Sequence, residues 1–203
     1  MRQALQALFL DIGGVLLTNG WDRQARSRAA EVFSLDPDEL QERHHMTYTT
    51  YEEGKIGLDE YLRRTIFYTE RGFSMQEVKD FIFSCSKPLA ENLEFFTLLK
   101  KRYALKCIAV SNEGLEITRY RITTFGLRSL FDFFVCSCFV HIRKPDEDIF
   151  RIALDGAQVE PARVAYVDDR ALFVQIARGL GVQGIHHTGL EKTKVFLAER
   201  GLE

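Results

Sequence analysis

The sequence predicts an α/β fold with a doubly wound parallel sheet and an inserted α-helical domain. Short apolar runs recur along the chain, and each is followed by turn residues and then by a helical pattern. The stretch from about Thr18 to Lys87 has no strong strand signal, but it contains several helix starts. Because a parallel sheet is covered on both faces, its strands are expected as continuous apolar runs that alternate with amphipathic helices.

Five apolar runs are predicted to form the buried strands of this sheet. In chain order they are Ala7 to Leu10, Lys106 to Val110, Phe133 to Cys136, Val164 to Val167, and Gln183 to His187. Apolar residues with helical spacing follow the third and fourth runs, which predicts helices after Pro145 and after Asp169.

The segment before Lys87 predicts helices. Asp36-Pro37-Asp38-Glu39 supplies a cap, a first-turn proline and acids near the helix N-terminus, and Ser74 with Glu77 forms a capping box. An amphipathic stripe between them is expected to pack into a core; its residues are Leu58, Tyr61, Leu62, Thr65 and Ile66. We therefore expect a core domain of residues 1–17 and 88–203 and a helical cap domain of residues 18–87. An insertion after the first strand lies at the carboxyl edge of the sheet, where open α/β folds bind ligands.

The bulk composition is that of an ordinary globular protein. The 203 residues are 46% hydrophobic and 28% charged, with 27 basic and 29 acidic side chains interspersed. Without a clustered basic face we expect no nucleic-acid partner, and without a long apolar segment we expect no membrane association. The four cysteines show neither C-x-x-C spacing nor the density of a secreted scaffold, so we expect buried free thiols and a cytoplasmic protein. We expect the protein to be a monomer or a homodimer.

Polar residues follow four of the predicted strands. Asp11 ends the first strand and is followed by Ile12, Gly13 and Gly14, where two glycines let the backbone turn sharply and approach a ligand. Turn formation alone would also explain this pattern. Ser111 and Asn112 follow the second strand, where such residues either cap a helix or bind an anion at its N-terminus.

The remaining two sites bring a cation and a pair of acids. Lys144 lies between a strand and a proline-started helix, which would fix a point charge at the sheet edge. Asp168 and Asp169 end the fourth strand, and two neighbouring carboxylates repel each other unless a cation neutralises them. Mg²⁺ suits such a pair. The carboxyl ends of parallel strands share one edge, so we expect all four sites to converge.

These four segments resemble, in order and spacing, motifs I to IV of the haloacid-dehalogenase superfamily, and the likeness covers essentially the whole chain. Residues 51–56, Tyr-Glu-Glu-Gly-Lys-Ile, resemble part of the small helical C1-type cap of the subfamily that includes sugar-phosphate phosphatases and haloacid dehalogenases. The resemblance implies a Rossmann-like sheet with a helical cap.

The resemblance also implies roles for individual residues. It makes Asp11 the nucleophile, Ser111 and Asn112 binders of phosphate oxygens, and Lys144 the charge that holds nucleophile and phosphoryl group together. Mg²⁺ would be held by Asp11, the carbonyl of Gly13, Asp168 and Asp169, with Asp169 the expected direct ligand.

The sequence departs from the family pattern at two places. Many phosphatases of the family carry a second aspartate, a general acid and base, two residues after the nucleophile, and this chain has Gly13 there. Proton transfer contributes typically about 10²- to 10⁴-fold in rate, so turnover could be slow or depend on an acid from the cap. Four cap residues could supply such a group: Glu52, Glu53, His44 and His45. Ordinary solvated roles are favoured for all four. After Asp169, Phe173 replaces a polar residue and is expected to pack.

The leading hypothesis is therefore a Mg²⁺-dependent phosphatase that hydrolyses a small phosphorylated metabolite, with a sugar phosphate as one candidate, through an aspartyl-phosphate. One alternative is a 2-haloacid dehalogenase, since those relatives also lack the second aspartate, although they need no metal. Another is a catalytically impaired module that binds a phosphorylated ligand without turning it over.

Overall fold

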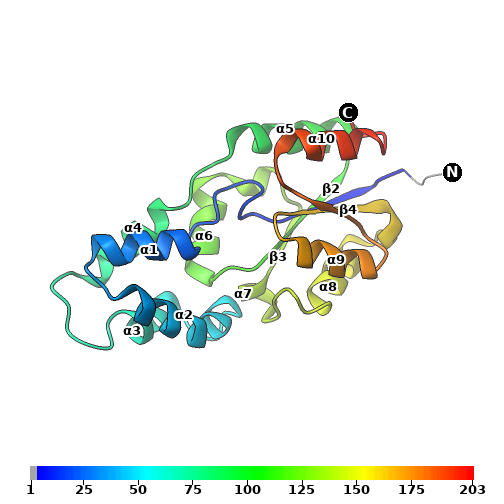
Figure 1. Cartoon of the computed structure of the whole chain (residues 1–203). Helices are drawn as coiled ribbons and strands as arrows, with labels where there is room; N and C mark the ends of the chain where they lie inside the picture. The colour runs from blue at the N-terminus through cyan, green and yellow to red at the C-terminus, as the bar shows by residue number, and fades with distance from the viewer. Residues whose placement is uncertain (1–3) are drawn as a thin grey trace.

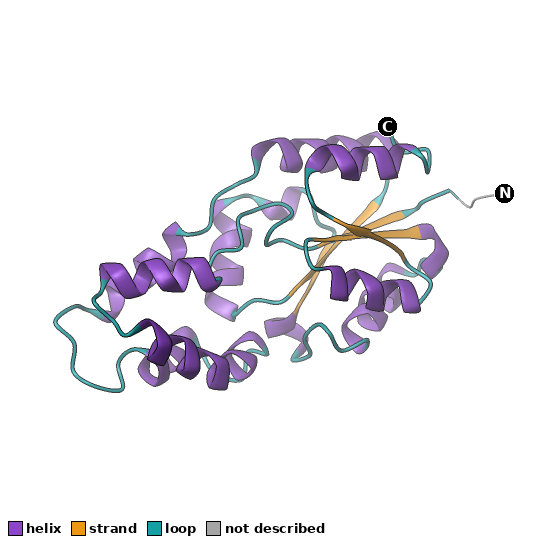
Figure 2. Cartoon of the chain, in the orientation of Figure 1, coloured by secondary structure: helices purple, strands orange, loops and turns teal. Residues whose placement is uncertain are grey.

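The sheet of this chain has five parallel strands, as the sequence predicts. The structure is a computed structural model that describes residues 4–203. The strands are β1 (Ala7–Leu10), β2 (Lys106–Ser111), β3 (Phe133–Cys136), β4 (Val164–Asp168) and β5 (Gln183–His186), in the order β3-β2-β1-β4-β5 (Figures 1 and 2). Each strand lies within one residue of its predicted bounds. The predicted doubly wound α/β fold is confirmed.

Helices cover both faces of the sheet, so its strands are apolar on both sides. On one face lie α5 (Ala90–Tyr103) and α10 (Leu190–Ala198), and on the other α8 (Asp148–Ala157) and α9 (Ala171–Gly179) (Figure 1). Side chains of β1 alternate between two apolar clusters: Leu8 and Leu10 pack on the first face, Ala7 and Phe9 on the second. This alternation is the two-residue period of a strand, and it explains why all four positions of β1 are apolar.

Four helices form a separate group beyond the carboxyl edge of the sheet (Figure 1). They are α1 (Arg23–Val32), α2 (Pro37–Glu52), α3 (Leu58–Thr65) and α4 (Met75–Ser84). The predicted caps are present, since Asp36 accepts hydrogen bonds at the start of α2 and Ser74 forms a capping box with Glu77. All five residues of the predicted stripe are buried, and all but Thr65 belong to a third apolar cluster, which also contains Trp21 and Val78.

The two connections between this helical group and the sheet run side by side. Thr18 donates its backbone N–H to the carbonyl of Lys87 at 2.9 Å, and Lys87 donates to Thr18 Oγ1 at 2.9 Å. An isolated antiparallel bridge joins Leu17 to Pro88. The segments that enter and leave the helical group are thus adjacent, as expected for an insertion into a core domain. The division at residues 18 and 87 stays a prediction.

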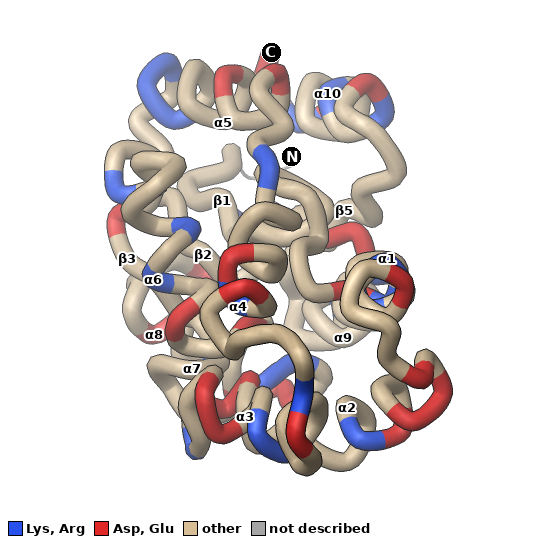
Figure 3. The backbone as a smooth tube through the Cα atoms, turned by 90° about the vertical axis from the view of Figure 1, so that its left-hand side faces the viewer, with Lys and Arg blue, Asp and Glu red and all other residues tan. Residues whose placement is uncertain are grey.

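The remaining elements are one further helix and three short segments. Helix α6 (Leu115–Thr124) follows β2, α7 (Ser137–Val140) follows β3, and single 3₁₀ turns occur at Leu127–Ser129 and Pro161–Arg163. All four cysteines are buried and unpaired, as expected. Basic and acidic residues are interspersed over the same helices (Figure 3). Within the described residues no helix combines the length and the apolar character needed to cross a bilayer.

Candidate active site

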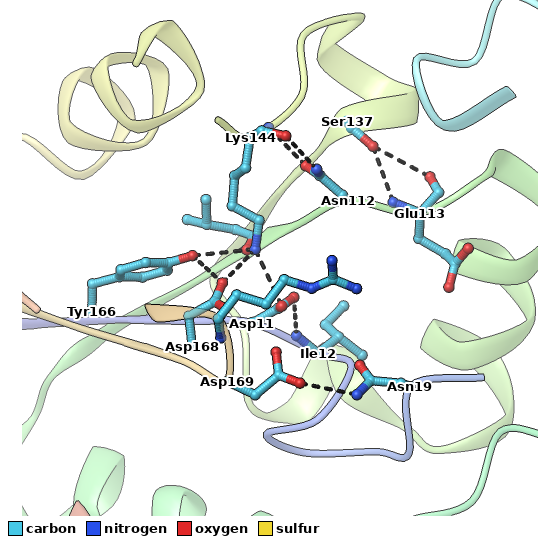
Figure 4. Close-up of polar contacts among 12 residues, drawn as sticks. Asp11, Ile12, Asn19, Asn112, Glu113, Ser137, Lys144, Tyr166, Asp168 and Asp169 are labelled. Carbon is cyan, nitrogen blue, oxygen red and sulfur yellow. Dashed lines mark hydrogen bonds and ion pairs between the residues drawn. The ribbon is translucent and has the colours of Figure 1, made fainter. Parts of the chain in front are cut away.

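Asp11 lies directly after β1 at the carboxyl edge of the sheet (Figure 4). Its N–H donates to the carbonyl of Val167 at 3.0 Å, which continues the pairing with β4 and fixes where the side chain emerges. Asp11 Oδ1 accepts a hydrogen bond from the Ile12 N–H at 2.7 Å. Burial raises the pKa of Asp11 to about 6, although the charge of Lys144 and a hydrogen bond from Ser111 oppose the rise. At pH 7 the carboxylate form therefore predominates.

Lys144 is fully buried and joins the ends of three strands. Its Nζ lies 3.2 Å from Asp11 Oδ2 and 2.7 Å from Asp168 Oδ2, and it donates to the carbonyl of Val110 at 2.9 Å. Burial alone would lower the pKa of Lys144, but the carboxylates of Asp11 and Asp168 raise it above its ordinary value. Lys144 is thus a permanent positive charge between the nucleophile position and the acidic pair.

Asp168 is committed to contacts within the protein. One oxygen accepts from Lys144 and from the hydroxyl of Tyr166, and the other accepts from the N–H of Arg170 at 2.7 Å (Figure 4). Burial would raise the pKa of Asp168, but Lys144 lowers it below its ordinary value. Both oxygens already have donors, so Asp168 has less capacity left for a cation than its neighbour.

Asp169 has the capacity that Asp168 lacks. Its Oδ2 accepts from the amide of Asn19 at 2.9 Å, whereas its buried Oδ1 has no hydrogen-bond partner among the described residues. Asp11, Asp168 and Asp169 each bring a carboxylate oxygen within 4.8 Å of the others. A buried carboxylate oxygen without a donor is costly unless a cation lies beside it, so the cluster fits a hard divalent ion such as Mg²⁺.

Gly14 is what allows Asp169 to come so close. The residue has φ +71°, and a Cβ built on it would overlap the Asp169 carboxylate. Any other residue would therefore be strained in its backbone and would displace this carboxylate. The close approach of Asp169 therefore explains why position 14 is a glycine.

Ser111 and Asn112 follow β2, but they differ in what their side chains can do. Ser111 is buried and its hydroxyl interacts with Asp11. Both polar atoms of the Asn112 side chain bind the backbone of Lys144: Nδ2 donates to the Lys144 carbonyl at 2.7 Å, and Oδ1 accepts from the Lys144 N–H at 2.8 Å. The Asn112 amide therefore positions the lysine, which leaves only its backbone N–H for an anion.

A cavity of about 330 Å³ opens above Asp11, between the sheet edge and the helical group. Gly13 lies at its floor, and a Cβ there would be 2.9 Å from Asn19 Oδ1 and 3.7 Å from Arg121 Nη1. A side chain at position 13 would therefore require Asn19 to move, whereas Arg121 would lie at ordinary contact distance.

Arg121 lines the cavity and binds both segments that connect the helical group to the sheet. It is 2% exposed, pairs with Glu113 at 3.1 Å, and donates to Ser86 Oγ at 3.0 Å and to the Thr18 carbonyl at 3.2 Å. Burial raises the pKa of Glu113 to about 7, against the lowering effect of Arg121. The Glu113–Arg121 pair thus links the end of β2 to the start and end of the helical segment.

The four cap residues considered as substitute acids lie in different surroundings. Glu52, His44 and His45 line the cavity, whereas Glu53 pairs with Lys55. Glu52 is held by Arg143 at 2.8 Å, and burial lowers the pKa of His44 to about 3. His44 is therefore neutral at pH 7. Phe173 packs as expected, since it is buried in the apolar cluster under α9.

Sequence reasoning missed Tyr166, Asn19 and Arg121. Tyr166 appeared to be a core residue, although the two-residue period of a strand places it on the same face as Asp168 and could have revealed the contact. Asn19 and Arg121 carry no local signal, because only the tertiary fold brings them to Gly13.

The fold and this edge define a doubly wound α/β protein with a lysine and three carboxylates at the carboxyl end of its sheet. A family model described as haloacid dehalogenase-like hydrolase matches residues 5–181. The chain therefore belongs to the haloacid dehalogenase-like hydrolases, as its four motifs indicate.

Two curated proteins are similar to this chain over part of their own length. A bifunctional epoxide hydrolase 2 from Sus scrofa is 27% identical over 201 residues, which cover 90% of this chain and 36% of that protein. A haloacid dehalogenase-like hydrolase domain-containing protein 3 from Mus musculus is 43% identical over 72 residues, or 36% of this chain and 28% of that protein. The matches thus span about a third of the length of these curated relatives.

Solved structures of similar fold include a complex with magnesium and phosphate and a haloacid dehalogenase. A HAD family enzyme from Bacteroides thetaiotaomicron, in complex with magnesium and inorganic phosphate, has TM-score 0.78 at 18% identity and covers 95% of this chain and 99% of its own. An L-2-haloacid dehalogenase from Xanthobacter autotrophicus with covalently bound chloropropionic acid has TM-score 0.62 at 14% identity, covering 98% and 84%. These likenesses concern the fold.

Proposed function

We propose that the chain is a Mg²⁺-dependent phosphatase that hydrolyses a phosphate monoester of a small metabolite, with Asp11 as nucleophile. The observation that carries the proposal is the unpartnered, buried Oδ1 of Asp169 beside Asp11 and Asp168. A dehalogenase needs no cation, whereas phosphoryl transfer does, because the nucleophile and the phosphoryl group are both negative. The magnesium and phosphate in the Bacteroides structure support the same reading.

The residues of the site are assigned roles on this basis. Asp169, Asp11, the carbonyl of Gly13 and, with less free capacity, Asp168 would hold Mg²⁺, which supplies charge neutralisation for the phosphoryl oxygens. Ser111, the backbone N–H of Asn112 and Lys144 would bind those oxygens. Lys144 lies 3.2 Å from Asp11, close enough for one ammonium group to contact both nucleophile and phosphoryl group.

The reaction then proceeds in two displacements. A carboxylate oxygen of Asp11 forms a bond to phosphorus, and the bond from phosphorus to the ester oxygen breaks, which leaves an alkoxide that takes a proton from water. A second water attacks the aspartyl-phosphate, loses a proton to solvent, and releases phosphate with the Asp11 carboxylate restored. Because Gly13 offers no acid, the rate should rise as the leaving group becomes less basic.

Residues 18–87 are proposed to be the cap of this enzyme. The cap would close the cavity over Asp11 and exclude bulk water, since Asp22, Gln41 and Tyr48 line the cavity opposite the sheet edge. The Glu113–Arg121 pair would hold both connections of the cap at a fixed distance from the site.

The test is hydrolysis of p-nitrophenyl phosphate with Mg²⁺ and with EDTA. Activity should require Mg²⁺ and should vanish in Asp11→Asn, while Asp155→Asn, which removes an exposed carboxylate from α8, should leave it unchanged. Metal-independent activity, or activity that survives Asp11→Asn, would refute the proposal.

A second candidate function is 2-haloacid dehalogenation, which the absence of an acid at Gly13 favours. In that reaction a carboxylate oxygen of Asp11 displaces halide from carbon, and water hydrolyses the resulting ester. Halide release from a 2-haloacid in EDTA would select it. Calorimetry that detects a bound phosphate ester without turnover would instead select a binding module.

A further inference from the structure

The cap side of the cavity carries two arginines without a counter-ion and a histidine nitrogen without a partner among the described residues. Arg23 and Arg26 on α1 and His44 on α2 all line the cavity that opens above Asp11. None of the three belongs to the proposed phosphoryl site, which lies at the opposite, sheet side of the cavity.

Arg26 is a buried cation without a counter-ion. It is 7% exposed, its Nε donates to Gln41 Oε1 at 3.0 Å, and its Nη1 donates to the carbonyl of Trp21 at 2.7 Å. Both partners are neutral, and no carboxylate among residues 4–203 forms an ion pair with it. A buried charge without a partner of opposite sign is costly, so this guanidinium is prepared for an anion from outside the chain.

The carboxylates that act on Arg26 from a distance are already in use. Asp22 caps helix α1 by accepting the N–H of Ala25 at 2.8 Å. Glu52 is bound by Arg143, with Nε at 2.9 Å and Nη2 at 2.8 Å. Neither is free to move to Arg26 without breaking an existing contact.

His44 presents a defined donor to the same space. Trp21 Nε1 can only donate, and it donates to the hydroxyl of Tyr61 at 2.8 Å; the hydroxyl proton is then available for His44 Nδ1, also at 2.8 Å. With the Tyr61 hydroxyl donating to Nδ1, the neutral ring carries its proton on Nε2. No acceptor for Nε2 occurs among the described residues.

Arg23 completes the group one helical turn before Arg26. Its side chain is exposed at the cavity rim, and within the described part of the chain it forms no ion pair. Its positive charge acts on Arg26, which places the two guanidinium groups in the same electrostatic neighbourhood.

We propose that Arg23, Arg26 and the Nε2–H of His44 bind a second anionic group of the substrate, a carboxylate or a second phosphate. The inference rests on the proposed phosphatase function and narrows its substrate to small phosphorylated acids or bisphosphates, in preference to neutral phosphorylated sugars. Planar guanidinium groups match the oxygens of either anion. A cavity of about 330 Å³ suits a ligand of that size.

The experiment compares matched substrates that differ in one anionic group. Values of kcat/KM are measured with Mg²⁺ for phosphoglycerate against glycerol phosphate, and for a hexose bisphosphate against the corresponding hexose monophosphate. At least one more highly charged member should be preferred by about tenfold or more, since charge-assisted hydrogen bonds each contribute about one order of magnitude. The pair that shows the preference identifies the anion. No preference in either pair would overturn the inference.

Variants assign the preference to these side chains. Arg26→Gln should reduce the preferred ratio about tenfold, and Arg23→Gln, at an exposed position that does not threaten folding, should reduce it about threefold. Arg28→Gln removes a positive charge from the same helix outside the cavity and should leave the ratio unchanged. Equal ratios in Arg23→Gln, Arg26→Gln and Arg28→Gln would contradict the assignment.

A failure of the phosphatase proposal can be told apart from a failure of this one. If p-nitrophenyl phosphate and all four metabolites resist hydrolysis, calorimetry with the full chain and Mg²⁺ measures their binding directly. Tighter binding of a more highly charged member by about tenfold would support the anion site, and equal or absent binding would overturn it.

Discussion

Replacing Asp11 by Asn should make the magnesium-free protein more stable at pH 7. Burial raises the pKa of this carboxyl from 3.8 to about 6, which is about two pKa units, and each unit corresponds to ~1.4 kcal/mol. Keeping Asp11 ionised in the folded state at pH 7 thus costs up to about 3 kcal/mol relative to the unfolded chain. An Asn side chain, like the protonated acid, avoids that cost, and Lys144 keeps Asp168 as its partner.

The sign of the pH dependence follows from the direction of the shift. Between pH 4 and pH 6 the folded protein binds the proton of Asp11 and the unfolded chain does not, so the free energy of unfolding falls as pH rises through this window. Below pH 4 both states are protonated at Asp11. The advantage of Asp11→Asn over the unsubstituted protein should therefore be largest above pH 6 and disappear near pH 4.

The assay is urea unfolding in EDTA at several pH values, with Asp155→Asn as a control for the loss of an exposed acid. Addition of Mg²⁺ should then stabilise the unsubstituted protein and have less effect on Asp11→Asn, because a ligand of the cation has been removed. An Asp11→Asn protein that is less stable than the unsubstituted one at pH 7, or a stability difference that does not change with pH, would refute the reasoning.

Three further substitutions test other parts of the site. Lys144→Met should destabilise the fold by about 3–5 kcal/mol in urea unfolding and abolish phosphatase activity, because it leaves buried carboxylates without their cation. Gly14→Ala should weaken Mg²⁺ affinity, measured by calorimetry, because its Cβ overlaps the Asp169 carboxylate, while Gly72→Ala, which meets no atom within 4 Å, should not. Tyr51→Phe should raise the unfolding free energy by about 1 kcal/mol, because the buried Tyr51 hydroxyl has no partner; a loss of stability would show that it has one.

The sequence by itself determined the sheet and the order of the polar residues along its edge. Strands buried on both faces are mostly apolar, so the runs Ala7 to Leu10 and Val164 to Val167 stand out in the sequence. The parallel arrangement then brings Asp11, Asp168 and Asp169 together, because carboxyl ends of parallel strands share one edge. Lys144 reaches the same edge from the loop after α7, which only the tertiary structure shows. The sequence was sufficient to predict the strands because the pattern of apolar residues in a strand involves only neighbouring residues.

Only the tertiary structure decided how the site is completed. Asn19 and Arg121 lie beside Gly13, and the side-chain amide of Asn112 binds the backbone of Lys144. The sequence also carried no sign that Arg26 would be buried without a counter-ion among the described residues. These features depend on contacts between residues far apart in the chain, and on which polar atoms remain unpaired after folding; neither leaves a pattern in neighbouring residues.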